Sequence, residues 1–400
     1  MNQTYDFLIV GAGIVGLTVA NELKTRFPSA GIAVIDKESG PGVHASGRNS
    51  GVLHSGIYYS SDTVKAKVCA AGAARMMEFA REHSIPFLKS GKVIIATSER
   101  DLPTVDKLLR NASENGIRSW RIDTKQLHEI EPHAAQGPAA IYSPDTAVID
   151  SPAVVRRLTE ILAQQGVSFF WQSGFRHVGT SGEVVTDRLK LGYGHLFNCS
   201  GAYADVVAKK FGLARDYALV PFKGIYWKLR PQANHLVRAN IYPVPDIDLP
   251  FLGVHLTRVI SGDVYVGPTA IPALGRENYG LIQGIRPVEA MQIGCRLAEM
   301  YLSDRLNFRR LAHVELSKYL KRNFLVAATR LLPDITAQDM IPTAKSGIRP
   351  QIVNVREGIL EMDYILQHTD HSTHVLNAIS PAFTSAFAFA KIIVDASGTT

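Results

Sequence analysis

The chain has 400 residues, of which 46% are apolar and 20% charged, and its formal net charge is +7. This composition excludes a disordered or fibrous protein, and the length predicts two domains or one domain with a large insertion. The basic residues are scattered, which argues against nucleic-acid binding and favours an acidic ligand or a loose contact with an anionic membrane surface.

The three cysteines, Cys69, Cys199 and Cys295, lie far apart, and the sequence contains no CxxC pair. Neither a disulfide framework nor a thiolate metal site is indicated, so we expect a cytoplasmic protein. The apolar stretch 7–23 is interrupted by glycines and follows a leader without Lys or Arg, unlike a signal peptide or membrane span. No other stretch predicts a transmembrane segment. The alternative to a free cytoplasmic protein is therefore one bound peripherally at the inner face of the membrane.

The first forty residues predict a βαβ unit. Tyr5–Val10 is a short apolar strand, the turn Gly11–Gly16 leads into a helix that ends near Phe27, and Gly31–Asp36 is a second apolar strand. Strand, helix and strand fit within about 30 residues, which is the size of one such unit.

Further along the chain we expect helices over 63–83, 102–115, 151–165 and 287–332, and strands over 91–96, 167–171 and 195–199. Residues 220–278 alternate apolar and polar positions and are rich in aromatics, which predicts a mixed or antiparallel sheet. The sequence therefore predicts an α/β protein with a Rossmann-like nucleotide domain (1–88, 145–216 and 340–400). A mixed or antiparallel β-sheet substrate domain (89–144 and 217–339) is inserted into it.

The G-x-G-x-x-G turn consists of Gly11, Gly13 and Gly16, and it follows a strand and opens a helix. The first glycine permits the tight turn, the second lets the backbone approach a pyrophosphate, and the third lets helix and strand pack closely. Asp36 ends the second strand, where a carboxylate can accept hydrogen bonds from ribose hydroxyls. The combination predicts a dinucleotide site.

The segment 45–59, ASGRNSGVLHSGIYY, resembles the D-amino-acid-oxidase-like FAD flavoproteins of the glutathione-reductase-like fold class, and within them the L-2-hydroxyglutarate oxidases/dehydrogenases. Further matching stretches cover nearly the whole chain: KAKVC (65–69), PFKG (221–224), FLGVHLTR (251–258), VGP (266–268) and NAISPAFTS (377–385). The resemblance implies a two-domain protein with non-covalent FAD and a substrate sheet over the flavin.

The resemblance and the glycine turn together predict a set of FAD-binding residues. The chain departs from the family pattern in residue type at two places. Cys199-Ser200 stands where the family has a small alanine-threonine type turn, and Phe175 stands where it has a valine-like residue. The opening of the C-terminal helix is expected to present its N-terminal amides to the flavin. The set is Gly11, Gly13, Ile14, Val15, Gly16, Asp36, Lys37, Ser46, Asn49, Ser50, Gly51, Val52, Phe175, Ser200, Gly201, Gly347, Arg349, Ser380, Pro381, Ala382 and Thr384.

The resemblance also implies a reaction, the oxidation of an L-2-hydroxy acid by hydride transfer to flavin N5. A histidine suits the base that takes the hydroxyl proton, because its pKa lies near neutrality. His54 is the first candidate because its segment is expected beside the flavin ring, and His255 and then His374 follow.

A diacid such as L-2-hydroxyglutarate needs cationic anchors, for which Arg258, Lys223, Arg349 and Arg48 are the candidates. Strand alternation places positions 255 and 257 on one face, so Arg258 points inward with His255 only if the strand bends. Tyr58 and Tyr59 are candidates for a hydrogen bond to the substrate or for core packing.

Two other stretches have less specific interpretations. HTDHSTH (368–374) contains three histidines, but their spacing does not favour a metal site; we expect a solvated loop there and no metal in the protein. GRENYG (275–280) is expected to be a loop that covers the pocket.

Several alternatives stay open on the sequence. The same fold could serve an amine or amino-acid oxidase, or a flavoprotein without catalysis. The electron acceptor is either oxygen or a membrane quinone, because the sequence has no motif for a second cofactor.

Overall fold

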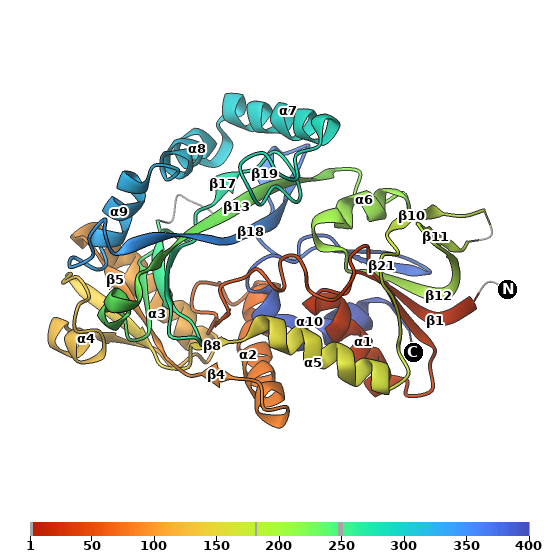
Figure 1. The fold of residues 1–400 in the computed structure, drawn as a ribbon, viewed down its shortest axis with the longest axis horizontal. Helices are drawn as coiled ribbons and strands as arrows, with labels where there is room; N and C mark the ends of the chain where they lie inside the picture. Colours follow the sequence, from red (N-terminus) through yellow and green to blue (C-terminus); the bar gives the residue numbers. More distant parts are fainter. Residues whose placement is uncertain (1–2, 181, 247–250, 400) are drawn as a thin grey trace.

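The computed structural model describes residues 3–180, 182–246 and 251–399. Within them, an eight-stranded sheet contains the predicted βαβ unit (Figure 1). Its parallel strands are β1 (Gln3–Val10), β2 (Ile32–Ile35), β9 (Ser168–Phe170), β12 (Lys190–Asn198) and β21 (Ser372–Val375). The antiparallel strands β10 (Phe175–Val178), β11 (Val184–Thr186) and β20 (Leu366–Thr369) extend it. The last four residues of β1 and all of β2 are buried, as expected for strands that are covered on both faces.

Four helices pack around this sheet. They are α1 (Ile14–Arg26), α2 (Val64–Glu82), α5 (Ser151–Gln164) and α10 (Ala382–Ala396). Helices α2 and α10 approach closely at Gly72, where an added Cβ would lie 2.4 Å from the Cα of Ser385. Because α10 comes from the C-terminus, this core joins both ends of the chain.

A second sheet, ten-stranded within the described residues, forms the other half of the molecule. Its strands are β5 (Lys92–Ala96), β6 (Trp120–Ile122), β7 (Ala139–Ser143), β13 (Tyr217–Leu229), β14 (Asn240–Pro243), β15 (His255–Arg258), β16 (Val264–Gly267), β17 (Ile271–Pro272), β18 (Met340–Asn354) and β19 (Ile359–Leu360). Val93, Ile241 and Leu256 face one side, in an apolar core with α9. The alternate residues of the same strands therefore face the opposite side.

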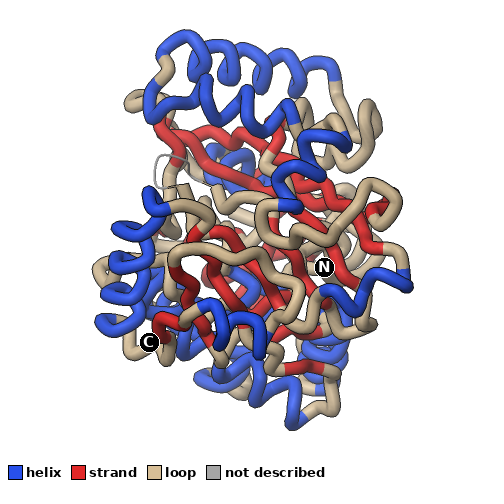
Figure 2. Tube along the Cα trace, turned by 90° about the vertical axis from the view of Figure 1, so that its left-hand side faces the viewer, coloured by secondary structure: helices blue, strands red, loops and turns tan. Residues whose placement is uncertain are grey.

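Three helices lie in a row along the outer side of this sheet, away from the nucleotide half: α7 (Pro287–Ser303), α8 (Phe308–Ser317) and α9 (Lys321–Thr329) (Figures 1 and 2). Shorter elements complete the described fold: α3 (Leu102–Glu114), α4 (Thr124–Ile130), α6 (Ala204–Lys209), and a small sheet of β3 (Val52–Leu53), β8 (Ala147–Ile149) and β4 (Phe87–Leu88). No helix among the described residues combines the length and apolarity needed to cross a membrane.

The helices expected over 63–83, 102–115 and 151–165 are present as α2, α3 and α5. The expected segment 340–400 is divided between the sheets: β18 and β19 pair with β13 in the ten-stranded sheet, whereas β20, β21 and α10 lie with the nucleotide sheet. We therefore propose that the third segment of the nucleotide domain begins after residue 360.

The expectation of a loop at 368–374 is wrong except at the turn, and the expectation of solvation is wrong for residues 372–374. Residues 366–375 form the β20–β21 hairpin, and β21 pairs with β12 in the nucleotide sheet. His374 is completely buried there, where its ring nitrogens bond with Asn198 and Ser372. His368, Thr369 and the turn at Asp370 and His371 are exposed, whereas Ser372, Thr373 and His374 are buried.

Candidate active site

A cavity of about 900 Å³ lies between the two sheets. Its walls come from the β1–α1 turn, the segment 42–54, the loop after β12, the strands β13, β15 and β18, and the start of α10. Two helices, α1 and α10, therefore open onto it with their N-termini, which carry partial positive charge. A volume of this size is at the upper end of ordinary cofactor and ligand pockets.

Each of the three glycines of the turn meets a different neighbour. Gly11 has φ +106°, and a Cβ there would lie 2.6 Å from the carbonyl oxygen of Cys199. A Cβ on Gly13 would face the cavity side at 3.2 Å from Ser46 Oγ, and one on Gly16 would lie 2.0 Å from the carbonyl oxygen of Gly11. Gly11 thus lets the turn pack against the backbone of the loop after β12, Gly13 leaves room beside Ser46, and Gly16 permits close packing of helix and strand.

The Asp36 carboxylate holds the turn in place from the end of β2. Its Oδ2 accepts a hydrogen bond of 2.7 Å from the Ala12 amide, and its Oδ1 accepts one of 2.9 Å from the Glu38 amide. The Ile14 amide at the start of α1 donates to Ser46 Oγ at 2.9 Å. The segment 42–54 is therefore fixed directly over the helix N-terminus.

Most of the predicted FAD-binding residues line this cavity. The exceptions are Gly16, which serves helix packing, and Gly51, where φ is +75° and a Cβ would meet the carbonyl oxygen of Ile149 at 2.7 Å. The lining residues of the predicted set are Gly11, Gly13, Ile14, Val15, Asp36, Lys37, Ser46, Asn49, Ser50, Val52, Phe175, Ser200, Gly201, Gly347, Arg349, Ser380, Pro381, Ala382 and Thr384.

The loop 275–280 borders the same cavity and is tied to its nucleotide end. Lys37 Nζ lies 2.6 Å from Glu277 and also contacts Glu38 and, at 2.9 Å, the His44 ring. Glu38, His44 and Glu277 are close enough to hold a metal, but the Lys37 ammonium already lies among them. Tyr279 of the loop contacts His44 Nδ1 at 2.6 Å.

His54 and His255 both line the cavity and are the two base candidates that the structure brings together. Burial lowers the pKa of His54 to about 3 and that of His255 to about 4, with the nearby Lys92 charge contributing to both shifts. His255 Nδ1 lies 2.9 Å from the carbonyl oxygen of Gly253. Since a carbonyl oxygen only accepts, Nδ1 carries the hydrogen and Nε2 keeps its lone pair.

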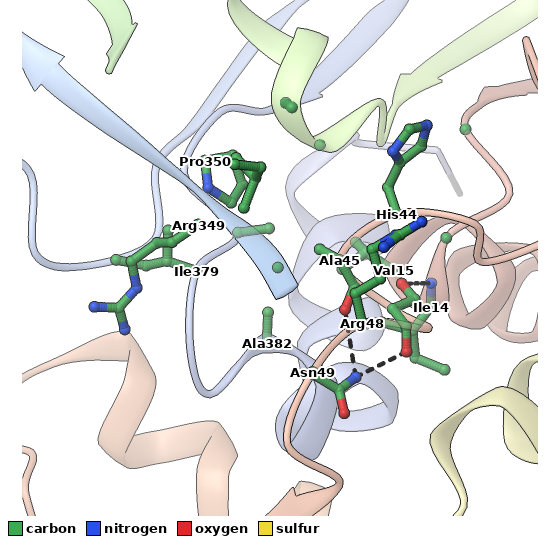
Figure 3. A pocket seen from close by; sticks show the side chains of 18 of the residues that line it. Ile14, Val15, His44, Ala45, Arg48, Asn49, Arg349, Pro350, Ile379 and Ala382 are labelled. Atoms are coloured by element: carbon green, nitrogen blue, oxygen red, sulfur yellow. Dashed lines mark hydrogen bonds between the residues drawn. The ribbon is translucent and has the colours of Figure 1, made fainter. Parts of the chain in front are cut away.

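Arg349 extends from β18 along the cavity wall, on the other side of the cavity from Arg48 and Asn49 (Figure 3). Its guanidinium lies 4.9 Å from the centre of the Phe251 ring and makes no hydrogen bond or ion pair within the described part of the chain. Burial lowers the pKa of Arg349 from its ordinary value. A half-buried guanidinium on a cavity wall, without a counter-ion among the described residues, is suited to an anionic ligand.

Three of the residues predicted as base or carboxylate anchor lie outside the cavity. Arg258 donates instead to the carbonyl oxygens of Asn234 and Val237, because strand alternation turns it to the face opposite His255. Lys223 is buried, and its ammonium donates to the carbonyl oxygen of Gly280 at 2.6 Å. His374 lies inside the nucleotide sheet, which excludes it as the base.

Sequence reasoning missed three residues on the face of the ten-stranded sheet that looks toward the cavity. Tyr226 and Tyr242 line it, and Lys92 lies close behind Tyr242. A lone lysine at the start of the apolar strand KVIIA was the one visible signal for Lys92.

These features define a dinucleotide-binding protein with a second, ten-stranded sheet over the cavity. The glycine turn on the cavity wall and the two helix N-termini fit a long dinucleotide that carries a pyrophosphate. The family model described as FAD dependent oxidoreductase matches residues 6–396. The chain belongs to this family: it is an FAD-dependent oxidoreductase.

The relatives and similar structures agree with this assignment. L-2-hydroxyglutarate dehydrogenase from Nematostella vectensis (mitochondrial) is 33% identical over 98% of this chain and 90% of the relative. The Escherichia coli K12 enzyme of that name is 32% identical over 98% of this chain and 92% of its own length. The FAD-bound L-alpha-glycerophosphate oxidase from Mycoplasma pneumoniae has the same fold, with a TM-score of 0.77 and 19% identity over 100% of this chain and 96% of that one.

Proposed function

We propose that the protein oxidises L-2-hydroxyglutarate to 2-oxoglutarate. The observation that carries the proposal is the half-buried Arg349 guanidinium, which has no hydrogen-bond or ion-pair partner among the described residues and lines the same cavity as two neutral histidines. The L-2-hydroxyglutarate dehydrogenases that match 98% of the chain support the choice of substrate. Bound FAD supplies the hydride acceptor.

In this proposal Arg349 binds the carboxylate next to the reacting carbon, and a histidine takes the hydroxyl proton. Lowered pKa values keep both His54 and His255 neutral at pH 7, so each ring has a lone pair for the proton. His54 remains the first candidate because its amide donates to Thr384 Oγ1 at the start of α10, the expected flavin side. The fixed Nδ1–H tautomer supports His255 as the alternative.

The second candidate function is an amine or amino-acid oxidase of the same fold. Glycine oxidase from Geobacillus kaustophilus shares this fold, with a TM-score of 0.71 and 18% identity over 98% of this chain and 94% of that chain. A single carboxylate anchor such as Arg349 would also serve an amino acid. Substrate tests therefore have to include both classes.

The deciding experiment is an anaerobic titration of the purified yellow protein. Addition of L-2-hydroxyglutarate is expected to bleach the flavin band near about 450 nm, whereas the D-isomer leaves it unchanged. Bleaching by amino acids alone would support the second function. A flavin that none of these compounds bleaches would contradict both.

For the electron acceptor, we propose a membrane quinone that the protein reaches from an anionic membrane surface. Residues 287–330 contain eight Lys or Arg against four Asp or Glu, an excess of four positive charges. The same helices, α7–α9, expose the apolar side chains Val288, Met291, Leu302, Leu320 and Val326. Basic charge beside exposed apolar side chains suits contact with an anionic bilayer.

Sedimentation with vesicles tests this contact. Binding to vesicles that contain anionic lipid, weaker binding to neutral vesicles, and faster flavin reoxidation by a quinone than by oxygen are expected. Leu302→Glu should release the protein from vesicles while its turnover with a water-soluble quinone stays unchanged. Equal sedimentation of Leu302→Glu and wild type would exclude this surface.

A further inference from the structure

Lys92 is a buried ammonium without an acceptor. Its side chain is completely buried, and Nζ makes no hydrogen bond and no ion pair within the described residues. Nζ lies 4.4 Å from the centre of the Tyr58 ring and 5.1 Å from that of Tyr242. Lys65, another buried lysine, differs because its Nζ donates to the carbonyl oxygen of Met362. Leaving an ammonium buried and unpaired is costly, which points to a use for it.

The groups around Lys92 also lack acceptors. The buried Tyr58 hydroxyl has no partner. The Tyr242 and Thr257 hydroxyls lie beside each other, and neither makes a well-formed hydrogen bond. An ammonium can only donate, and each hydroxyl has a hydrogen to donate. The cluster therefore offers several donors to a ligand, and a carboxylate has the acceptor oxygens to match them.

This cluster lies at the wall of the cofactor cavity. Tyr242 lines the cavity, and in the sheet it pairs with Ile94, two residues beyond Lys92 on the same face of β5. His54, which lines the cavity too, is within electrostatic reach of both Lys92 and Arg349. Two cations without counter-ions among the described residues, the buried Lys92 of β5 and the half-buried Arg349 of β18, thus act on the same base candidate.

We propose that Lys92 determines specificity by binding the distal carboxylate of a dicarboxylic 2-hydroxy acid, while Arg349 binds the carboxylate beside the reacting carbon. The inference rests on the proposed function and extends it to the second carboxylate. Tyr242 turns aside on binding to bring the carboxylate to the ammonium, and the Tyr58 hydroxyl donates to the same carboxylate. Burial lowers the pKa of Lys92 to about 7, so a bound carboxylate also secures its charged form.

The test compares L-2-hydroxyglutarate with L-2-hydroxyvalerate, which has a methyl group in place of the distal carboxylate. Lys92→Met keeps the length of the side chain and removes its charge. It should lower kcat/KM for the diacid on the order of 100-fold, mainly through KM, because a buried charged partner is lost. The value for the monoacid should change by less than about threefold. Lys92→Arg should restore part of the preference for the diacid.

Each outcome decides a different point. If Lys92→Met lowers kcat/KM equally for both substrates, or leaves the diacid unaffected, the inference about Lys92 is wrong while the proposed function stands. If wild-type protein bleaches with neither substrate, the proposed function itself fails. Flavin content and Tm control for folding. If Lys92→Met loses its flavin, Tyr58→Phe supplies the same comparison, and a selective loss of affinity for the diacid is expected. An equal loss for both substrates in Tyr58→Phe would contradict the inference.

Discussion

Replacement of Arg349 by Met is the most direct test of how the cavity recognises its substrate. The guanidinium lies on the cavity wall with Phe251 beneath it and without a hydrogen bond or ion pair in the described residues, so a substrate carboxylate would be its first counter-ion. Removing one partner of a buried, hydrogen-bonded charge pair costs about 2–5 kcal/mol. At about 1.4 kcal/mol per factor of ten, kcat/KM should fall by roughly 30-fold to several thousandfold.

Anaerobic stopped-flow measurement of flavin reduction separates the loss of substrate affinity from the loss of the limiting reduction rate. The apparent Kd for L-2-hydroxyglutarate should rise, and the limiting rate should fall further if Arg349 also orients the reacting carbon. The matched control is Arg258→Met, because the Arg258 guanidinium binds backbone carbonyls outside the cavity and should leave both parameters near wild type. An unchanged Kd in Arg349→Met at normal flavin content would refute the assignment.

Three further predictions address the base, the cofactor floor and the acid stability. His54→Ala should lower kcat by about 10²–10⁴-fold at unchanged flavin content, and a comparable loss in His255→Gln alone would move the base to His255. Gly11→Ala should yield flavin-free protein by absorbance, since its Cβ would lie 2.6 Å from a carbonyl oxygen; a normal flavin spectrum would contradict the close approach. Burial lowers the pKa of His374 to about 4, so the folded protein holds this ring neutral while the unfolded chain protonates it below about pH 6.5. The contribution of His374 to the free energy of unfolding is therefore complete above pH 6.5 and is lost as the pH falls toward 4. In urea titrations, His374→Gln should therefore reduce the dependence of the unfolding free energy on pH by about 1 kcal/mol per pH unit between pH 6.5 and 4.5. An unchanged pH dependence would contradict this prediction.

The nucleotide end of the site was accessible to sequence reasoning because it depends on local geometry. A strand, a glycine turn and a helix follow one another in the chain, so Gly11, Gly13 and Asp36 could be placed without knowing the rest of the fold. Gly51 was misjudged because a glycine can be required by close backbone packing as well as by a ligand, and sequence alone does not separate the two causes.

The substrate end depends on which face of a sheet looks toward the cavity, and that is decided by long-range pairing. Lys223 is one residue away from the cavity-lining Phe222 and Gly224, and Arg258 is three residues from the cavity-lining His255, an odd separation that puts it on the opposite face of the strand. A shift of one residue reverses the face of a strand, so motif membership could not locate these cations. Lys92 was missed for the same reason, since its position follows from the pairing of β5 with β14, which is remote in sequence.

The charges on the cavity wall differ between its two ends, so we expect the two ends to favour different ligands. Among the lining residues within the described ranges, the acids are Asp36, Glu38, Asp187 and Glu277. Asp36 accepts from backbone amides, Glu38 and Glu277 contact Lys37, and Asp187 pairs with Arg176, so none of these carboxylates is available to neutralise Arg349. Arg349 thus stands on the ten-stranded sheet as a lining cation without a carboxylate partner among the described residues, and a positive charge there would favour anions before any chemistry occurs. A carboxylate introduced beside it, as in Phe251→Glu, should pair with Arg349 and raise the KM for the substrate without loss of the flavin, since Phe251 lies under the guanidinium and not at the glycine turn.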